Sequence, residues 1–181
     1  KNIECFGLIK ASAKGGFAAG NSIRENYQNL TKVISGEKTI KEAFGFRELF
    51  SNDTSDSFLT APKLPATTLS EGCYALMFGG CTSLKVAPEL PATTLTQTCY
   101  SRMFSGCESL IEAPELPAKT LARNCYSAMF SDCTSLTEAP ELPAANLTLE
   151  CYIQMFDGCS NLSKMRVGFE KFSESPADII V

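Results

Sequence analysis

The sequence contains no histidine and no tryptophan. Without histidine, neither a Ser-His-Asp triad nor a Cys-His nucleophile pair can be assembled from this chain alone. The mixed Cys/His zinc sites are excluded for the same reason. We therefore expect a protein that is not an enzyme and that has no catalytic residue, no cofactor and no bound metal ion.

Basic residues and long apolar runs are also scarce. The net charge is −4 and the sequence pI is about 5.0, whereas a nucleic-acid partner requires a basic surface that can neutralise phosphates. No apolar run approaches the ~20 residues that span a bilayer, so we expect no membrane-spanning segment. The chain begins at Lys1 without a basic and apolar leader, and we expect any signal or anchor to lie outside these residues.

The most prominent feature of the sequence is a repeat of 26 residues. The segment 87–112, APELPATTLTQTCYSRMFSGCESLIE, recurs without insertions as 61–86, 113–138 and 139–164. Self-similarity at a fixed period of this size is typical of stacked repeats, in which no single unit buries its own apolar face. The repeat therefore predicts one elongated domain rather than a globular one.

One leucine column extends the array toward the N-terminus. Counting back 26 from Leu84 reaches Phe58, and a further 28 reaches Leu30, if the polar segment 51–57 holds two extra residues. We therefore place degenerate coils at 29–60, an N-terminal cap at 1–28 and a C-terminal cap at 165–181, because terminal units of an array need an atypical surface. The alternation of Met165, Val167 and Phe169 predicts a closing edge strand with these side chains inward. The regular column members are Leu84, Leu110, Leu136 and Leu162.

Each copy combines a helical pattern with a proline-rich segment. Leu95, Cys99 and Met103 are spaced by four residues, and Tyr100 and Phe104 stand beside the last two, which predicts an amphipathic helix of about three turns. Thr93 and Thr94 are suitable N-caps and Gly106 a suitable C-cap. Prolines at 114 and 117 leave room only for a short extended segment.

The pattern LPATTLxxxCYxxMFxGCxSLxxAPE resembles the BspA-like branch of bacterial leucine-rich-repeat surface proteins. The resemblance is close over 61–164 and looser over 30–60. It implies an α/β fold, a right-handed solenoid of about five coils with short strands on one face and short helices on the other. It also implies export to the cell surface or beyond, and a role in adhesion or protein recognition.

Eight of the nine cysteines form two columns at the repeat spacing. A disulfide framework and a site of four thiolates are two hypotheses, and small thiols filling tight interior positions are the third. We favour buried free thiols, because neighbouring members of a column point in parallel about 4.8 Å apart and form a line rather than a tetrahedron. In the degenerate coil, counting back assigns Gly45 and Ser55 to these columns. The columns are Cys73, Cys99, Cys125 and Cys151, and Cys81, Cys107, Cys133 and Cys159.

A tyrosine column accompanies the cysteines. It allows an aromatic binding strip, but tyrosines at helical spacing beside leucine are more often core residues, and we expect core. Each buried hydroxyl then needs a partner or an opening to water. The column consists of Tyr74, Tyr100, Tyr126 and Tyr152.

Glutamates form two further columns, one following each Ala-Pro and one preceding it. Like charges about 5 Å apart repel by about 1 kcal/mol even in water, so folding alone does not require them. A solvated face, part of a binding face and a carboxylate pair for glycoside hydrolysis are the three alternatives, and the first is the usual one. We take the variable positions beside the Ala-Pro motif, with these glutamates, as the candidate partner-binding face: Lys85, Val86, Glu89, Ile111, Glu112, Glu115, Thr137, Glu138 and Glu141.

Two functional hypotheses of different classes remain. The first is a non-catalytic surface or secreted recognition module that binds a protein, with a glycan as the second ligand class. The second is a structural spacer within a larger cell-surface protein, which low variability between copies would suit. A differentiated face favours the recognition module.

Overall fold

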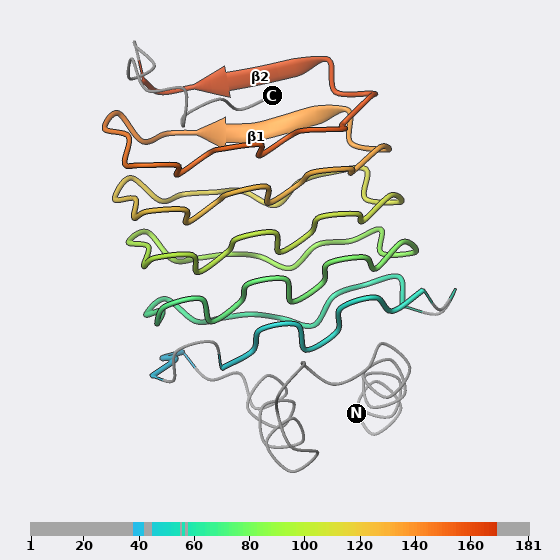
Figure 1. Ribbon diagram of the computed structural model, residues 1–181, viewed down its shortest axis with the longest axis horizontal. Coiled ribbons are helices and arrows are strands. Elements are labelled where there is room, and N and C mark those ends of the chain that lie inside the picture. Colours follow the sequence, from blue (N-terminus) through green and yellow to red (C-terminus); the bar gives the residue numbers. More distant parts are fainter. Residues whose placement is uncertain (1–37, 42–44, 55, 57, 170–181) are drawn as a thin grey trace.

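The computed structural model describes residues 38–41, 45–54, 56 and 58–169. Within these residues, successive copies of the repeat form successive coils that lie directly on one another (Figure 1). The expectations for the cap at 1–28 and for Leu30 fall outside the described residues. The described tail includes the first part of the predicted C-terminal cap.

One side of the stack, here called the strand side, is held by parallel pairing between coils. Strand β1 (Glu138–Leu142) pairs in parallel with strand β2 (Lys164–Val167). Earlier coils are joined by single bridges at the same position, Thr60 to Val86, Val86 to Glu112 and Glu112 to Glu138. The prolines of each coil have no N–H to donate, which accounts for ladders this short. The β1–β2 register shifts between Glu138 and Glu141, where β1 contains Pro140.

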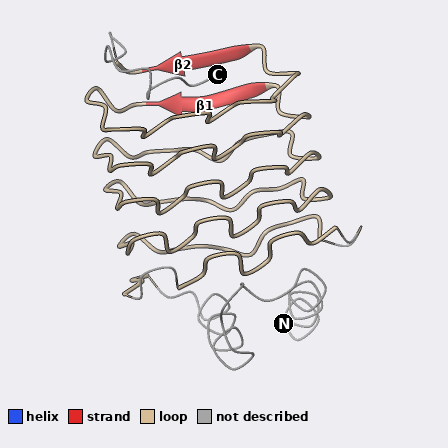
Figure 2. Ribbon diagram, viewed as in Figure 1, coloured by secondary structure: helices blue, strands red, loops and turns tan. Residues whose placement is uncertain are grey.

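The opposite side, here called the turn side, contains no α-helix in any described coil (Figure 2). Between residues 96 and 107, alternate N–H groups close tight turns, as in Met103 N–H to Tyr100 O at 3.2 Å. The N–H groups between them donate to the next coil, as in Phe104 N–H to Met129 O at 2.9 Å. Five such bonds, from Thr98 to Gly106, link this coil to its successor. The predicted helix is therefore replaced by a ribbon of overlapping turns.

Left-handed residues recur at every fourth position of this ribbon. Thr98, Arg102 and Gly106 have φ of 53°, 54° and 74°. The same places in the following coil hold Asn124, Ala128 and Asp132, with φ of 53°, 49° and 59°. A non-glycine residue in this region costs roughly 1–2 kcal/mol, so the bonds between coils must offset a repeated local cost.

The four-residue spacing explains why a helix was predicted. Side chains four apart share one face of an α-helix, but each such step rotates by about 40° beyond a full turn. Leu95, Cys99, Met103 and Cys107 are all buried, although three helical steps would carry the last one about 120° from the first. A ribbon that repeats every four residues keeps all four facing inward. The exact spacing of four was the signal that distinguished the two structures.

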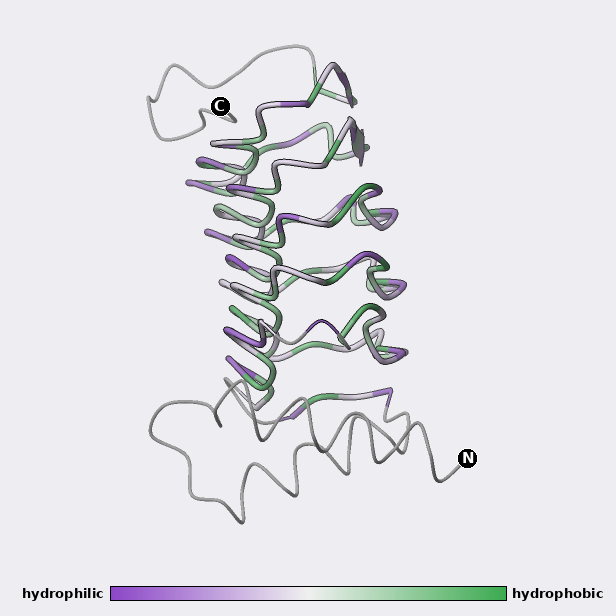
Figure 3. Cartoon of the chain, turned by 90° about the vertical axis from the view of Figure 1, so that its right-hand side faces the viewer, coloured by the Kyte–Doolittle hydropathy of each residue, from purple (hydrophilic) through white to green (hydrophobic). Residues whose placement is uncertain are grey.

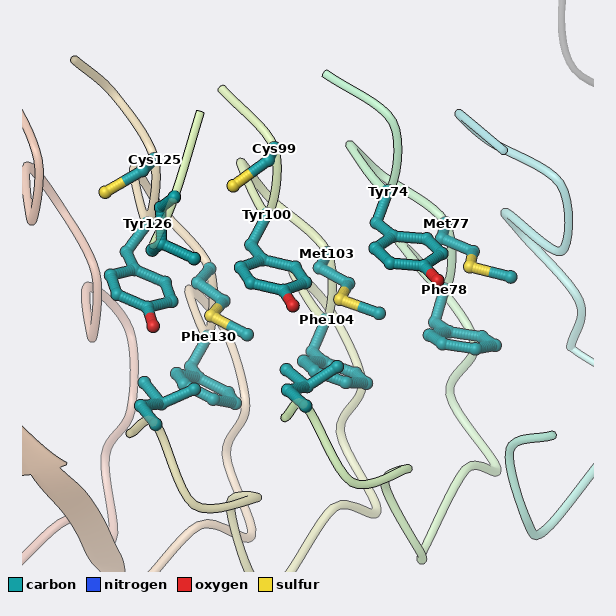
Figure 4. Close-up of a cluster of buried hydrophobic side chains, with 14 of the residues drawn as sticks. Tyr74, Met77, Phe78, Cys99, Tyr100, Met103, Phe104, Cys125, Tyr126 and Phe130 are labelled. Atoms are coloured by element: carbon teal, nitrogen blue, oxygen red, sulfur yellow. The ribbon is translucent and has the colours of Figure 1, made fainter. Parts of the chain in front are cut away.

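The core lies between the two sides and consists of columns that continue through the coils (Figure 3). Tyr74, Tyr100 and Tyr126 stack with ring centroids 5.8 Å apart, and Phe78, Phe104 and Phe130 stack at 5.6 Å (Figure 4). The tyrosine, methionine and phenylalanine positions are buried in all four regular copies, which confirms their assignment to the core. Phe46 and Phe169 stack on the two ends of the tyrosine column.

Two details of the sequence interpretation are wrong. Phe50 stacks on Phe78, 28 residues away, and this offset assigns Asp53, not Ser55, to the second cysteine column; Asp53 is fully buried. From Thr60, which bridges to Val86, the offset to the next coil is 26, so the two extra residues lie between Asp53 and Thr60. In β2, Met165 and Val167 are each 40% exposed, whereas Phe169, which follows β2, is buried. Of the three side chains predicted to face inward, only that of Phe169 is buried.

Candidate functional site

The nine candidate positions all lie on the strand side, and all are exposed. They belong to three columns that run along the stack. The first contains Leu59, Lys85, Ile111, Thr137 and Ser163; the second contains Thr60, Val86, Glu112, Glu138 and Lys164; the third contains Lys63, Glu89, Glu115 and Glu141. The parallel bridges place members of the second column directly beside one another.

Buried leucines at the two ends of each proline-rich segment position these side chains. Leu84 and Leu90 point into the core, while Lys85 and Glu89 are exposed. The same pattern recurs at Leu110 and Leu116. Buried leucines on both sides therefore fix the segment and display the variable residues between them. The scaffold is constant from coil to coil, and the displayed residues change.

Large apolar side chains occupy exposed positions in three successive coils. Leu59 is 41% exposed, Val86 53% and Ile111 52%. Bridges join Thr60 to Val86 and Val86 to Glu112, so these three side chains come from adjacent segments about 4.8 Å apart. The sequence interpretation included Val86 and Ile111 but omitted Leu59, which counting back 26 from Lys85 would have found.

Carboxylates share the coils of Val86 and Ile111 and continue in the next coil. Glu112 bridges to Glu138 in the second column, and Glu89, Glu115 and Glu141 are exposed in the third. Lys164 continues the second column, and its Nζ lies 3.1 and 3.3 Å from the two carboxylate oxygens of Glu138. In the part of the chain described by the structure, Glu89, Glu112 and Glu115 make no ion pair.

The buried thiols contribute structure rather than reactivity. All eight cysteines of the two columns are free. In the second column each thiol donates to a phenylalanine carbonyl of the preceding coil, as in Cys107 Sγ to Phe78 O at 3.2 Å and Cys133 Sγ to Phe104 O at 3.1 Å. Burial raises the pKa of Cys81 to about 12 and that of Cys99 to about 11. A thiol that stays protonated is a poor nucleophile and a poor metal ligand.

The described residues contain no cluster of three or more cysteine, aspartate or glutamate side chains that could hold a metal ion. A shallow depression on the turn side is lined by Glu48, Ser51, Asn52, Leu76, Gly79, Gly80 and Ser105. Gly79 stands where the next coil has Ser105, so no side chain fills the depression at that position. It contains one carboxylate and no second acid or base, so it offers no catalytic pair.

Comparison with protein families, with curated proteins and with solved structures finds no match for this chain. Over the described residues, the structure has no helix with the length and apolarity needed to cross a bilayer.

Proposed function

We propose that this chain is a non-catalytic recognition module of the cell surface or the extracellular medium, whose strand side binds a protein partner. The observation that carries the proposal is the contrast between the buried and the exposed positions of each coil. Buried positions repeat the same leucine, cysteine, tyrosine, methionine and phenylalanine, whereas the first exposed strand-side column differs in every coil and the second changes from Thr60 through Val86 to glutamate and Lys164. Extended faces of stacked repeats are suited to binding partners.

We further propose that the chain belongs with BspA-like leucine-rich-repeat proteins, as a right-handed solenoid. The support is the repeat pattern itself, the parallel pairing of successive coils and the buried leucine column. In this proposal the turn ribbon replaces the helices that the family pattern predicted. Export to the cell surface follows from the same resemblance.

A protein partner is favoured over a glycan. Every phenylalanine and tyrosine in the described residues is buried, so the strand side offers no aromatic ring on which a sugar or a base could stack. It offers aliphatic side chains and carboxylates instead, which suit a polypeptide. The alternative function is a structural spacer, and the uniform interior of the coils is the observation that favours it.

A binding panel tests the proposal. The chain is applied to immobilised extracellular-matrix and plasma proteins and to a glycan array, beside the double variant Ile111→Ser/Glu112→Gln. We expect binding to at least one protein that the double variant loses. The matched control Gln97→Ser, an exposed turn-side change, should bind like the unmodified chain. If the chain bound no protein and no glycan on the panel, the spacer would be favoured. If the control Gln97→Ser lost binding as fully as the double variant, the binding site would lie elsewhere.

A further inference from the structure

We propose that the strand side takes an extended segment of its partner that is apolar at one end and rich in lysine or arginine at the other, lying along the stack. This inference rests on the proposed function and specifies the chemistry of the partner. The surface is the strand-side face formed by Leu59, Val86 and Ile111, continued by Glu112, Glu115 and Glu141. The apolar half and the acidic half of this surface are complementary to different side chains of the partner.

The apolar half comes first along the stack. Leu59, Val86 and Ile111 keep about half of their surface exposed, although their columns hold polar residues elsewhere, such as Thr60, Thr137 and Ser163. The fold therefore accepts polar residues at these positions. Leu59 and Ile111 lie in the first column with Lys85 between them, and Val86 is next to Lys85 in the second column. Clustered exposed apolar side chains mark interaction sites more often than isolated ones do. Covering them would remove apolar surface from water, which is the main driving force of association.

The acidic half begins in the coil of Ile111, with Glu112 and Glu115, and continues in the next coil with Glu138 and Glu141. The Glu112 and Glu138 segments bridge directly, and carboxylates about 4.8 Å apart repel by about 1 kcal/mol at the dielectric of water. Glu112 and Glu115 come from one coil and lack ion pairs among the described residues. A partner cation placed over them would relieve this repulsion, so the charge of the face is complementary to a basic segment.

Lys164 shows how a lysine pairs with the glutamates of the second column. Lys164 stands one coil beyond Glu138, and its ammonium group contacts both carboxylate oxygens. The pair is exposed on both sides, so it contributes little to stability, but it ends the glutamate column with a cation. Among the described residues, Glu112 and Glu115 have no such neighbour, so a cation of the partner can pair with them.

An extended partner fits the dimensions of the face. The five coils from Leu59 to Ser163 span about 19 Å at the parallel-strand spacing. An extended peptide of six residues covers about the same length. Alternate side chains of such a peptide face the surface, so apolar residues would meet Leu59 and Val86 before basic residues reach the coil of Glu112 and Glu115.

Peptides of defined pattern test the inference. The probe is a fluorescein-labelled octapeptide, Leu-Ser-Leu-Ser-Lys-Ser-Lys-Ser, titrated with the full chain by fluorescence anisotropy at 20 and 300 mM salt. The two comparison peptides carry Glu in place of Lys, or Ser in place of Leu. We expect the first peptide to bind at least about tenfold tighter than either comparison at low salt, and to weaken at high salt because exposed charges are screened.

Variants of the chain locate the binding. Glu112→Gln and Glu115→Gln should each weaken the probe about two- to fivefold, as expected of exposed ion pairs, and Ile111→Ser should weaken it at either salt concentration. Glu71→Gln, an exposed turn-side change, is the matched control and should have no effect. No binding, equal binding of the acidic peptide, or insensitivity to these variants would overturn the inference.

Two further outcomes separate this inference from the proposed function. A panel protein that binds through Ile111 but whose bound segment is acidic would keep the proposed function and overturn the basic segment. Sedimentation that shows a dimer dissociated by Ile111→Ser would make the face a contact between two copies, and would also overturn it.

Discussion

The phenol oxygens of Tyr100 and Tyr152 are buried and have no hydrogen-bond partner among the described residues. Burial also raises the pKa of Tyr100 well above its usual value, so the hydroxyl stays neutral. A buried hydroxyl without a partner loses its hydration and gains nothing in return. The same column uses phenylalanine at both ends, Phe46 and Phe169, so the ring and not the hydroxyl is what the stack requires.

Replacing Tyr100 by phenylalanine should therefore raise the free energy of unfolding by about 1 kcal/mol. The ring keeps its contacts with Tyr74 and Tyr126 at 5.8 Å, and only the unpartnered oxygen is removed. Urea unfolding followed by far-ultraviolet circular dichroism measures the change. A loss of more than about 1 kcal/mol would show that the hydroxyl has a stabilising partner.

Phe104→Ala provides the contrast in the same assay. Phe104 is fully buried between Phe78 and Phe130, and truncating a buried phenylalanine costs about 3–5 kcal/mol. A substitution at the exposed Lys85 should stay within about 0.5 kcal/mol.

At the scale of the element, the turn ribbon combines an unfavourable local conformation with favourable bonding between coils. Its alternate N–H groups, such as those of Tyr100, Arg102 and Phe104, all donate toward the next coil. In an isolated copy these donors would have no acceptor. The ribbon is therefore a product of stacking, and local propensity in the sequence cannot reveal it.

Substitutions at Arg102 distinguish the ribbon from a helix. At φ of 54°, Arg102→Gly should be neutral or stabilising by up to about 1 kcal/mol, because relief of the left-handed strain outweighs the entropy of glycine. In a helix the same change would cost about 1 kcal/mol. Arg102→Val should cost about 1–2 kcal/mol, since a branched side chain is poorly tolerated there.

The neighbouring residue supplies the matched control. Ser101 has no left-handed backbone, so Ser101→Gly should destabilise by about 0.5–1 kcal/mol. Urea midpoints for the three variants decide the matter. If Arg102→Gly and Ser101→Gly were equally destabilising, the backbone of this segment would be helical.

These elements show what the sequence could predict. The period, the leucine column and the burial of Tyr100, Met103 and Phe104 followed from counting, because stacking places equivalent residues in one column. The helix did not follow, since a spacing of four fits a helix over short distances. Asp53 was missed because two extra residues could be placed only to within the segment 51–57. For the face, variability selected the exposed positions, and the 26-residue period placed Val86 beside Glu112, which the bridge between them confirms.

At the scale of the whole molecule, the two cysteine columns and the tyrosine column make one continuous set of buried, neutral, titratable groups. Burial raises the pKa of Cys73 and Cys81 to about 12 and of Cys99 to about 11, from an ordinary value of 9.0. Burial also raises the pKa of Cys107 and Cys125 in the middle coils. Because the coils stack into a single cooperative array, these groups act on one unfolding equilibrium.

The sign of the resulting pH dependence is fixed by these shifts. Above pH 9 the unfolded chain releases thiol protons that the folded chain retains, so the stability contributed by each thiol is complete below pH 9 and is lost as pH rises toward 11–12. Each such thiol costs about 1.4 kcal/mol at pH 10, against a total stability of about 5–15 kcal/mol. We therefore expect cooperative alkaline unfolding between about pH 9.5 and 10.5, measured by circular dichroism with a reductant present.

The variant Cys107→Ser/Cys133→Ser tests the origin of this pH dependence. Serine does not titrate in this range, so the free energy of unfolding of the variant should fall by about 3 kcal/mol less between pH 8 and 10 than that of the unmodified chain. Equal stability of the unmodified chain at pH 8 and pH 10.5 would show that the thiols are not buried in the folded protein.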